Sequence, residues 1–327
     1  MEKLYNKVSI IGAGTWGIAV AQLLVDKVTV QLHHYNKISL EALNKTKKHP
    51  RISSHSISDK IIVKKDMHVD ADLCIISVPV QHIRSVVESI TLDKHVPVLI
   101  LSKGIEKKTL MFPIDIVKQV LNVKKVGVLS GPSHAEQVLE KHPTTIVASF
   151  RSKSLSESIR SLFSNEYFRV YSNTDIIGVQ LGGAAKNVIS IAAGICCGLG
   201  YKENTISAIV TRGIHEIKKI GIKIGAKKNT LNGLSGTGDL IATAFSNDSR
   251  NRLYGELLGK GMTSDDANLK IGTIAEGSET ADSLFSLIRK IDVEAPICVS
   301  VYKIINSNES PEKIMKNLMI RKLKNEI

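Results

Sequence analysis

The chain has 327 residues, of which 43% are hydrophobic, and its formal net charge is +13. This length favours two domains over one, and no apolar window of about 18 residues is free of polar breaks, so no integral membrane segment is predicted. The positive charge fits nucleic acid, an anionic membrane surface or a small anionic ligand. Because the lysines are scattered and few aromatic residues accompany them, we interpret most lysines as solvated and predict no nucleic-acid partner.

Cysteine and histidine usage argues against disulfides and metal. The four cysteines, Cys74, Cys196, Cys197 and Cys298, contain no C-x-x-C pair. A chain with reduced thiols in the cytoplasm is the simplest interpretation. The ten histidines show no H-E-x-x-H or similar spacing, so we predict no metal site.

Apolar, β-branched runs alternate with helical patterns in the first half of the chain. The runs predict strands within 7–14, 27–35, 61–63, 72–79, 97–104, 126–132, 144–150 and 168–173. The helical patterns lie within 15–26, 81–90, 112–121 and 154–163. Such alternation predicts βαβ units and a mainly parallel, Rossmann-like α/β sheet.

The pattern changes near residue 175, after which helical stretches follow one another without a convincing strand pattern. These stretches cover 176–197, 204–224, 249–259, 275–291, 296–306 and 311–323. We therefore predict an α/β domain at 1–174 and an all-helical domain at 175–327. A cleft between two such domains is a common place for a ligand.

The stretch "GAGTWG" places Gly12, Gly14 and Gly17 in a G-x-G-x-x-G pattern. It follows a predicted strand and opens a predicted helix, which is the context that dinucleotide binding requires. Gly12 allows the tight turn, Gly14 lets a pyrophosphate approach the backbone, and Gly17 lets the helix pack on the sheet. The helix amino terminus offers N–H groups to the phosphates. We therefore predict that residues 1–174 bind a dinucleotide.

The second strand ends in "HHYN", where an acidic residue usually binds the ribose 2′-hydroxyl. His33, His34, Tyr35 and Asn36 carry no negative charge, so a 2′-phosphate is not repelled. A protonated histidine could attract that phosphate, or the pair could be ordinary polar residues at a strand end. Both interpretations stay open, and no arginine establishes NADP specificity.

Three later motifs close strands at the carboxyl edge of the predicted sheet, where ligands of open α/β sheets bind. They are "SVPV" (77–80), "SKGIE" (102–106) and "SGPSHA" (130–135). Lys103 could place an ammonium beside a cofactor or substrate, or it could be a solvated loop lysine. The last motif combines a turn with a helix start, where backbone N–H groups can meet an anion.

A lysine, Lys186, lies inside the small and apolar run "QLGGAAKNVISIAAGICCG". Lysine is rarely buried unless it is paired or used. It could lay its stem on apolar neighbours with the ammonium in water. Alternatively, it could transfer a proton in a partly dry cleft.

Two polar motifs follow in the helical region. "LSGTGDL" (234–240) carries Asp239, and Thr243 lies four residues on, so a helix beginning there would put both on one face. "NDSRNRLYG" (247–255) places Ser249, Arg250 and Asn251 at a helix start, where the arginine fork suits a phosphate. The alternative for this motif is a capped helix start with a surface arginine.

Together these motifs resemble the NAD(P)-dependent glycerol-3-phosphate dehydrogenase family, in its bacterial type. The chain carries, in the family's order and approximate spacing, GAGTWG, SVP, SKG, SGPSHA, AAKNVISIAAG, TRGIHE, GLSGTGDL, SRN and AEG. The resemblance covers about residues 7 to 305. It implies reduction of dihydroxyacetone phosphate to sn-glycerol 3-phosphate with NADH or NADPH, for phospholipid synthesis, by a cytoplasmic homodimer.

The resemblance also implies roles for individual residues, with Lys186 matching the catalytic lysine. Substrate positions are matched by Lys103, Gly131, Ser133, Lys186, Asp239, Thr243, Ser249, Arg250 and Asn251. Cofactor positions are matched by Gly12, Gly14, Thr15, Trp16, Gly17, Tyr35, Lys103, Ala135, Arg250 and Glu276. Tyr35 stands where a histidine or arginine is common in the family, which leaves the choice between NAD and NADP open.

Other functions remain as alternatives. Another β-hydroxyacid-type dehydrogenase would share the two-domain plan and a lysine in the helical domain. The "SRN" motif and the spacing around "GTGDL" argue against it. A noncatalytic NAD(P)-binding sensor would bind the cofactor without turnover. An aldolase-like Schiff base at Lys186 is chemically reasonable, but it leaves the glycine fingerprint unexplained.

Overall fold

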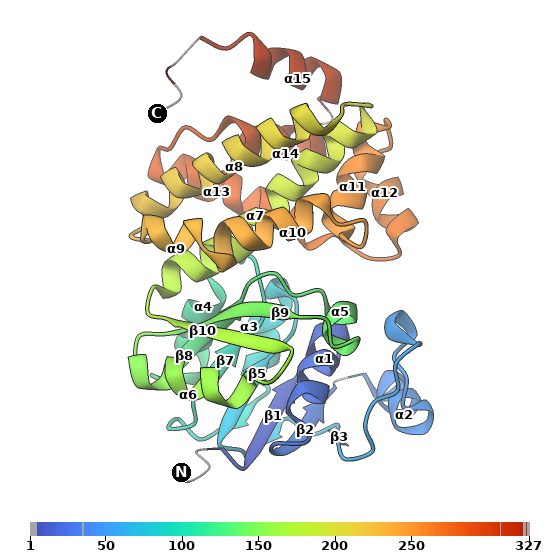
Figure 1. Cartoon of the computed structure of the whole chain (residues 1–327), viewed down its shortest axis with the longest axis vertical. Coiled ribbons are helices and arrows are strands. Elements are labelled where there is room, and N and C mark those ends of the chain that lie inside the picture. The colour runs from blue at the N-terminus through green and yellow to red at the C-terminus, as the bar shows by residue number, and fades with distance from the viewer. Residues whose placement is uncertain (1–4, 35, 308, 323–324, 326–327) are drawn as a thin grey trace. The chain divides into compact units, whose positions relative to one another are not determined.

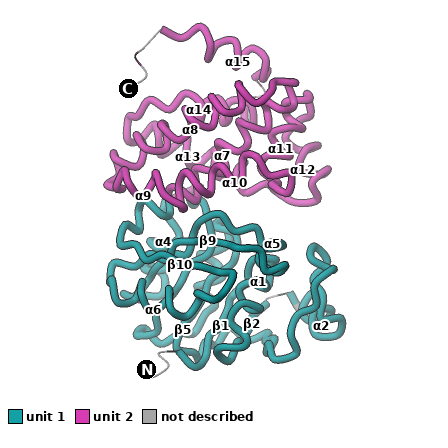
Figure 2. Tube along the Cα trace, in the orientation of Figure 1, with its two compact units in different colours: residues 1–106, 111–180 teal, residues 107–110, 181–327 magenta. Residues whose placement is uncertain are grey.

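The computed structural model describes residues 5–34, 36–307, 309–322 and 325. Contacts divide the chain into two compact units, shown in different colours in Figure 2. Unit 1 consists of residues 1–106 and 111–180, and unit 2 of residues 107–110 and 181–327. The predicted domain boundary at 174/175 lies six residues before the main division between these units, and it stays a prediction.

Unit 1 is an α/β unit (Figure 1). Its elements are β1 (Lys7–Ile11), α1 (Thr15–Leu24), β2 (Thr29–His33), α2 (Lys37–Thr46), a 3₁₀ turn (Pro50–Ile52), β3 (Ile62–Lys64), β4 (His68–Val69), β5 (Leu73–Ile76), α3 (Val80–Glu88), β6 (Thr91–Leu92), β7 (Val98–Ile100), α4 (Pro113–Leu121), β8 (Val126–Ser130), α5 (Ala135–Leu139), β9 (Thr144–Phe150), α6 (Lys153–Phe163) and β10 (Phe168–Asn173). The predicted strands are the eight strands of the main sheet.

The main sheet has the order β10-β9-β8-β7-β5-β1-β2-β3. Its neighbouring strands are parallel except for β8 and β9, which confirms a mainly parallel, Rossmann-like sheet. The chain moves from β1 to β2 and β3 on one side, and continues with β5 on the other side of β1. The strand order therefore reverses between β1 and β5, and open α/β sheets bind ligands at the carboxyl ends of the strands beside such a reversal.

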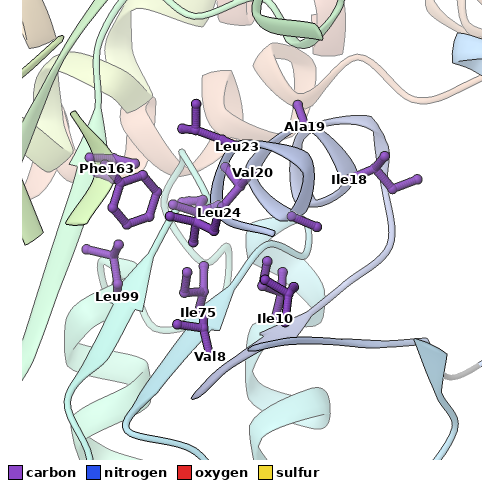
Figure 3. Close-up of a cluster of buried hydrophobic side chains, with 14 of the residues drawn as sticks. Val8, Ile10, Ile18, Ala19, Val20, Leu23, Leu24, Ile75, Leu99 and Phe163 are labelled. Atoms are coloured by element: carbon purple, nitrogen blue, oxygen red, sulfur yellow. The ribbon is translucent and has the colours of Figure 1, made fainter. Parts of the chain in front are cut away.

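One face of the sheet and the helices α1, α5 and α6 enclose a hydrophobic core of unit 1. Figure 3 shows Ile10 of β1, Ile75 of β5 and Leu99 of β7 below Leu24 of α1 and Phe163 of α6. These side chains are fully buried. Their alternation along the strands sends every second residue to this face, and burial of such large apolar side chains stabilises each by roughly 1.5–3 kcal/mol. The core therefore holds α1, and with it the glycine turn, rigidly on β1.

The regular elements among the described residues of unit 2 are all helices (Figure 1). Its elements are α7 (Ile176–Gly198, whose first turn belongs to unit 1), α8 (Glu203–Lys223), α9 (Lys228–Asn232), a π-helical turn (Leu234–Gly238), α10 (Asp239–Phe245), α11 (Arg250–Gly259), α12 (Ser264–Ile271), α13 (Glu276–Ile291), α14 (Pro296–Ser307) and α15 (Pro311–Met319). The prediction of an all-helical second half is confirmed.

Several short elements were missed from the sequence. The strands β4 and β6 have two residues each and the helix α9 has five, whereas α5 begins where the motif at 130–135 predicted a helix start. Elements this short carry too few residues for a periodic pattern of apolar side chains. The helix α2 was not predicted because it is largely polar, and Leu40 and Leu43 are the buried residues among its described side chains.

Helix α7 is long and apolar enough to cross a membrane, with a mean hydropathy of 1.4 over its most apolar window. The polar breaks in the sequence argued against such a helix. In the structure, 89% of that window is buried inside the protein. Packing against other protein elements therefore accounts for the composition of α7 without a membrane.

Candidate functional site

The glycine turn between β1 and α1 can be made only by glycine. Gly12 has a φ of +112°, and a Cβ atom there would lie 2.4 Å from the Ser77 carbonyl oxygen after β5. A Cβ at Gly17 would lie 2.0 Å from the Gly12 carbonyl oxygen. The turn therefore packs directly against the end of β5, beside the point where the strand order reverses.

The start of α1 fits the pyrophosphate of a dinucleotide. Gly14 is the N-cap residue and gives the first turn no side-chain hydrogen bond, and no acidic residue lies in that turn. A Cβ at Gly14 would meet no described atom within 4 Å. Backbone N–H groups and the positive end of the helix dipole therefore face open space without a competing side chain. Thr15 and Trp16 begin the helix half-buried, and Trp16 packs on the hydrophobic core.

The end of β2 does not offer a charged histidine. His33 is buried and its Nδ1 lies 2.6 Å from the Asp66 carbonyl oxygen, while burial lowers its pKa. Burial also lowers the pKa of His34. Both rings therefore favour the neutral form near neutral pH, and we do not expect a histidinium to attract a 2′-phosphate. Tyr35, the predicted cofactor residue here, lies outside the described residues, and Asn36 caps α2 by accepting from the Ser39 N–H.

The loops after β7 and β8 meet at one carbonyl group. Lys103 Nζ donates to the Gly131 carbonyl oxygen over 3.2 Å, and Ser133 Oγ donates to the same atom over 3.0 Å. Gly131 has a φ of +148°, which a side chain would strain. Ala135 is the first residue of the five-residue helix α5 and is buried. The structure thus brings three predicted substrate residues of unit 1 into one cluster.

Lys186 is buried and paired, which excludes the solvated interpretation. Only 8% of the residue is exposed. Its Nζ donates to Asp239 Oδ1 over 2.8 Å and to Thr243 Oγ1 over 2.7 Å. Asp239 and Thr243 are themselves buried. Removing an ammonium from water is costly, and a buried carboxylate at this distance offsets that cost and favours the charged lysine.

Local structure explains how Asp239 and Thr243 reach the lysine. The glycine-rich segment Leu234–Gly238 forms a π-helical turn directly before α10. Asp239 then opens α10 and Thr243 lies one turn later on the same face, as the sequence predicted. The Thr243 hydroxyl also lies 2.7 Å from the Asp239 carbonyl oxygen, which orients it. Single π turns in helices are frequent at functional sites.

The "SRN" motif forms a capped helix start with an exposed arginine. Ser249 is buried and its Oγ accepts from the Arg252 N–H at the start of α11. Arg250 is exposed and makes no hydrogen bond or ion pair within the part of the chain that the structure describes. Its five donors are therefore available to an anion.

Asn251 joins the starts of two helices. Its Oδ1 accepts from the Gly277 N–H over 2.9 Å, next to Glu276, the first residue of α13. A Cβ at Gly277 would lie 3.0 Å from the Asn187 carbonyl oxygen, so these helix starts lie close to the lysine-bearing helix α7. The sequence did not identify Ser77 and Asn187 as neighbours of the site, although they lie within the motifs "SVPV" and "QLGGAAKNVISIAAGICCG".

A glycine turn at the reversal point of a parallel sheet, in a chain that also buries a lysine against a carboxylate in a helical unit, is typical of two-domain nicotinamide-dependent dehydrogenases. Profiles described as the N-terminus and the C-terminus of NAD-dependent glycerol-3-phosphate dehydrogenase match residues 7–156 and 175–316. The chain belongs to this NAD(P)-dependent oxidoreductase family.

Individual relatives agree with this assignment. The chain is 38% identical to a glycerol-3-phosphate dehydrogenase [NAD(P)+] of Clostridium botulinum, over 98% of this chain and 99% of the relative. It is 39% identical to that of Bacillus subtilis, over 97% and 94%. The solved glycerol-3-phosphate dehydrogenase of Coxiella burnetii superposes with a TM-score of 0.91 at 29% identity, covering 97% of this chain and 100% of that one.

A structure titled as a probable 2-dehydropantoate 2-reductase of Bacillus subtilis is similar at a TM-score of 0.60 and 15% identity, over 93% of this chain and all of that one. This likeness shows a shared fold alone. It agrees with the expectation that other hydroxyacid-type dehydrogenases share the two-domain plan, without favouring their substrates here.

Proposed function

We propose that this chain reduces dihydroxyacetone phosphate to sn-glycerol 3-phosphate with NADH or NADPH. The observation that carries the proposal is Lys186, buried with its ammonium 2.8 Å from Asp239 Oδ1 and 2.7 Å from Thr243 Oγ1. Membership of the glycerol-3-phosphate dehydrogenase family supports the same reaction.

The cofactor-binding group is proposed to be the glycine turn and its neighbours. Gly12 and Gly17 shape the turn, Gly14 leaves open space, and the N–H groups of the first turn of α1 bind the pyrophosphate. The further cofactor residues proposed from the family resemblance are Thr15, Trp16, Tyr35, Lys103, Ala135, Arg250 and Glu276. When bound, the nicotinamide supplies the hydride that reduces the substrate carbonyl carbon.

Lys186 is proposed as the general acid. As the carbonyl oxygen of dihydroxyacetone phosphate gains negative charge, the ammonium stabilises that charge and donates its proton to the oxygen. The lysine is left neutral and regains a proton from solvent. Asp239 favours the charged form before the reaction, and Thr243 orients Nζ. In the reverse direction the neutral amine accepts the proton of the alcohol.

The substrate phosphate is proposed to bind at the start of α11. The exposed Arg250 offers a planar fork of donors that matches a phosphate in bidentate fashion. Ser249 and Asn251 flank it, and Lys103, Gly131 and Ser133 are the substrate residues proposed in unit 1. Such contacts hold the reacting carbonyl in place and so lower the entropic part of the barrier.

We also propose that the chain acts in the cytoplasm as a homodimer and that its product feeds phospholipid synthesis, on the basis of the family resemblance. Light scattering coupled to size-exclusion chromatography measures the oligomeric state directly. A monomeric mass would overturn the homodimer.

The activity is tested by following the oxidation of NADH and of NADPH after addition of dihydroxyacetone phosphate. Turnover is expected with this substrate and at least a tenfold loss of kcat/KM with unphosphorylated dihydroxyacetone, because Arg250 then has no partner. Binding of NADH without turnover would instead identify a sensor. Turnover with 2-dehydropantoate alone would identify a hydroxyacid-type dehydrogenase.

A further inference from the structure

Two rows of residues, one on α7 and one on the π-helical turn and α10, face each other around the buried Lys186. Gly182, Lys186 and Ser190 follow one another at four-residue intervals on one face of α7, and the Ser190 hydroxyl donates to the Lys186 carbonyl oxygen. Ser235, Asp239 and Thr243 show the same spacing across the π-helical turn and α10. Gly182 lies close to Ser235, and one helical turn further along both segments Lys186 pairs with Asp239.

The approach at Gly182 is close enough to require glycine. A Cβ there would lie 2.4 Å from the Ser235 carbonyl oxygen and 3.0 Å from the Gly236 Cα. Both are backbone atoms, so no side-chain rotation can relieve the overlap. The turn also packs closely on Leu231, since a Cβ at Gly236 would lie 2.2 Å from the Leu231 carbonyl oxygen. Thr237 Oγ1 donates a hydrogen bond to the Leu231 carbonyl oxygen over 3.1 Å, which closes the turn.

We propose that Gly182 is a positioning residue, which sets the distance between Lys186 and Asp239 by letting the π-helical turn rest directly on α7. The inference rests on the proposed function, since it assigns Gly182 a part in keeping the general acid charged. A side chain at 182 displaces the turn, and Asp239 moves with it because it is the next residue after that turn. The carboxylate then stabilises the ammonium of Lys186 less.

Several other charged groups on the helices around α7 have partners of their own. Glu216 of α8 accepts from the N–H groups of Ile297 and Cys298. Arg252 and Glu256 of α11 lie within 4.0 Å of each other, and Glu279 of α13 lies 3.5 Å from Lys107. Arg250 and Glu276 begin α11 and α13. Because its Oδ1 lies 2.8 Å from Nζ, Asp239 is the carboxylate that we expect to affect the titration of Lys186.

The test compares Gly182→Ala with Gly198→Ala on the same helix. Gly198 is a matched control, since a Cβ there would lie 2.2 Å from the Glu256 carbonyl oxygen, an equally severe overlap twelve residues beyond Lys186. Both variants should lose thermal stability. With dihydroxyacetone phosphate, Gly182→Ala should lower kcat about tenfold, with KM changed less than about threefold. The basic limb of its kcat–pH profile should move to lower pH by about one unit, because the ammonium is less stabilised.

Thr237→Val serves as a milder second variant if Gly182→Ala does not fold. It removes the hydrogen bond that closes the turn and keeps the side-chain volume, so the basic limb should move in the same direction by a smaller amount. A basic limb unchanged from wild type in Thr237→Val and in folded Gly182→Ala overturns the positioning role. The same holds if Gly198→Ala moves the limb equally. Absence of activity in the wild-type protein overturns the proposed function instead, so the two failures are distinguishable.

Discussion

The glycine turn of unit 1 and the lysine cluster of unit 2 are built by different means. The turn is made of backbone, within six consecutive residues from Gly12 to Gly17, and its chemistry is that of free N–H groups at a helix start. The cluster is made of side chains, and it joins Lys186 to Asp239 across 53 residues of sequence. A local backbone motif tolerates many changes around it, whereas a buried charge pair depends on the packing of every helix that carries it.

The largest effect is expected at Lys186, because its substitution should reduce turnover while leaving the glycine turn of unit 1 unchanged. Lys186→Met keeps the length and apolar stem but removes the ammonium, so turnover should fall about 10²- to 10⁴-fold. NADH binding, followed by quenching of Trp16, the single tryptophan, should persist because the turn is untouched. Lys223→Met, at an exposed position at the end of α8, is the matched control and should keep full activity. Ordinary kcat in folded Lys186→Met would remove the lysine from catalysis.

A smaller effect is expected at Arg250. This prediction tests whether the exposed start of α11 binds the same substrate on which the buried Lys186 acts. Arg250→Ala should reduce kcat/KM for dihydroxyacetone phosphate about 10- to 100-fold, mainly through KM, because a charge-assisted contact is lost. Arg250→Lys should recover only part of this loss, since lysine lacks the fork. Arg212→Ala, on an exposed position of α8, is the control. A normal KM in Arg250→Ala would place the phosphate elsewhere.

Two glycines of the turn separate folding from ligand binding, because we expect Gly12 to affect stability and Gly14 to affect cofactor affinity. Gly12→Ala forces a side chain into a φ of +112° and against Ser77, so it should lower the free energy of unfolding by about 1–3 kcal/mol or more. Gly14→Ala meets open space and should change stability by less than about 0.5 kcal/mol. Its Kd for NADH should nevertheless rise about tenfold, as titration calorimetry can measure. Equal cofactor affinity in Gly14→Ala and wild type would contradict the pyrophosphate site.

The smallest effect concerns Glu216, a buried carboxyl in unit 2. Burial raises its pKa, while the N–H groups of Ile297 and Cys298 oppose the rise. A carboxyl with a raised folded-state pKa contributes stability that is complete below its unfolded value and is lost as pH rises through the folded value. The stability advantage of wild type over Glu216→Gln should therefore shrink from about pH 4.5 upward, by about a few degrees in melting temperature. Parallel melting curves at every pH would contradict this.

Much of the fold could be predicted from local patterns. Several strands of the main sheet are runs of buried residues, such as "KVSII" in β1 and "TTIVASF" in β9, and burial on both faces makes such runs easy to recognise. The glycine turn was equally accessible, because Gly12, Gly14 and Gly17 act through conformation and space within one short segment. Polar elements that bury little, such as α2 and the strand β4, gave no comparable signal.

The lysine cluster shows where sequence reasoning ends for this protein. The sequence by itself determined an α/β half with a dinucleotide-type turn, a helical half, and the presence of Lys186, Asp239 and Thr243 in motifs of the family. It left two interpretations of the lysine open, since burial is a property of the packed chain. Only the tertiary structure shows that this lysine is buried, with the Asp239 carboxylate 2.8 Å from its ammonium, and proton transfer by Lys186 stays a prediction. The physical reason is that the energy of a charge depends on what surrounds it in space, and those surroundings come from residues far apart along the chain.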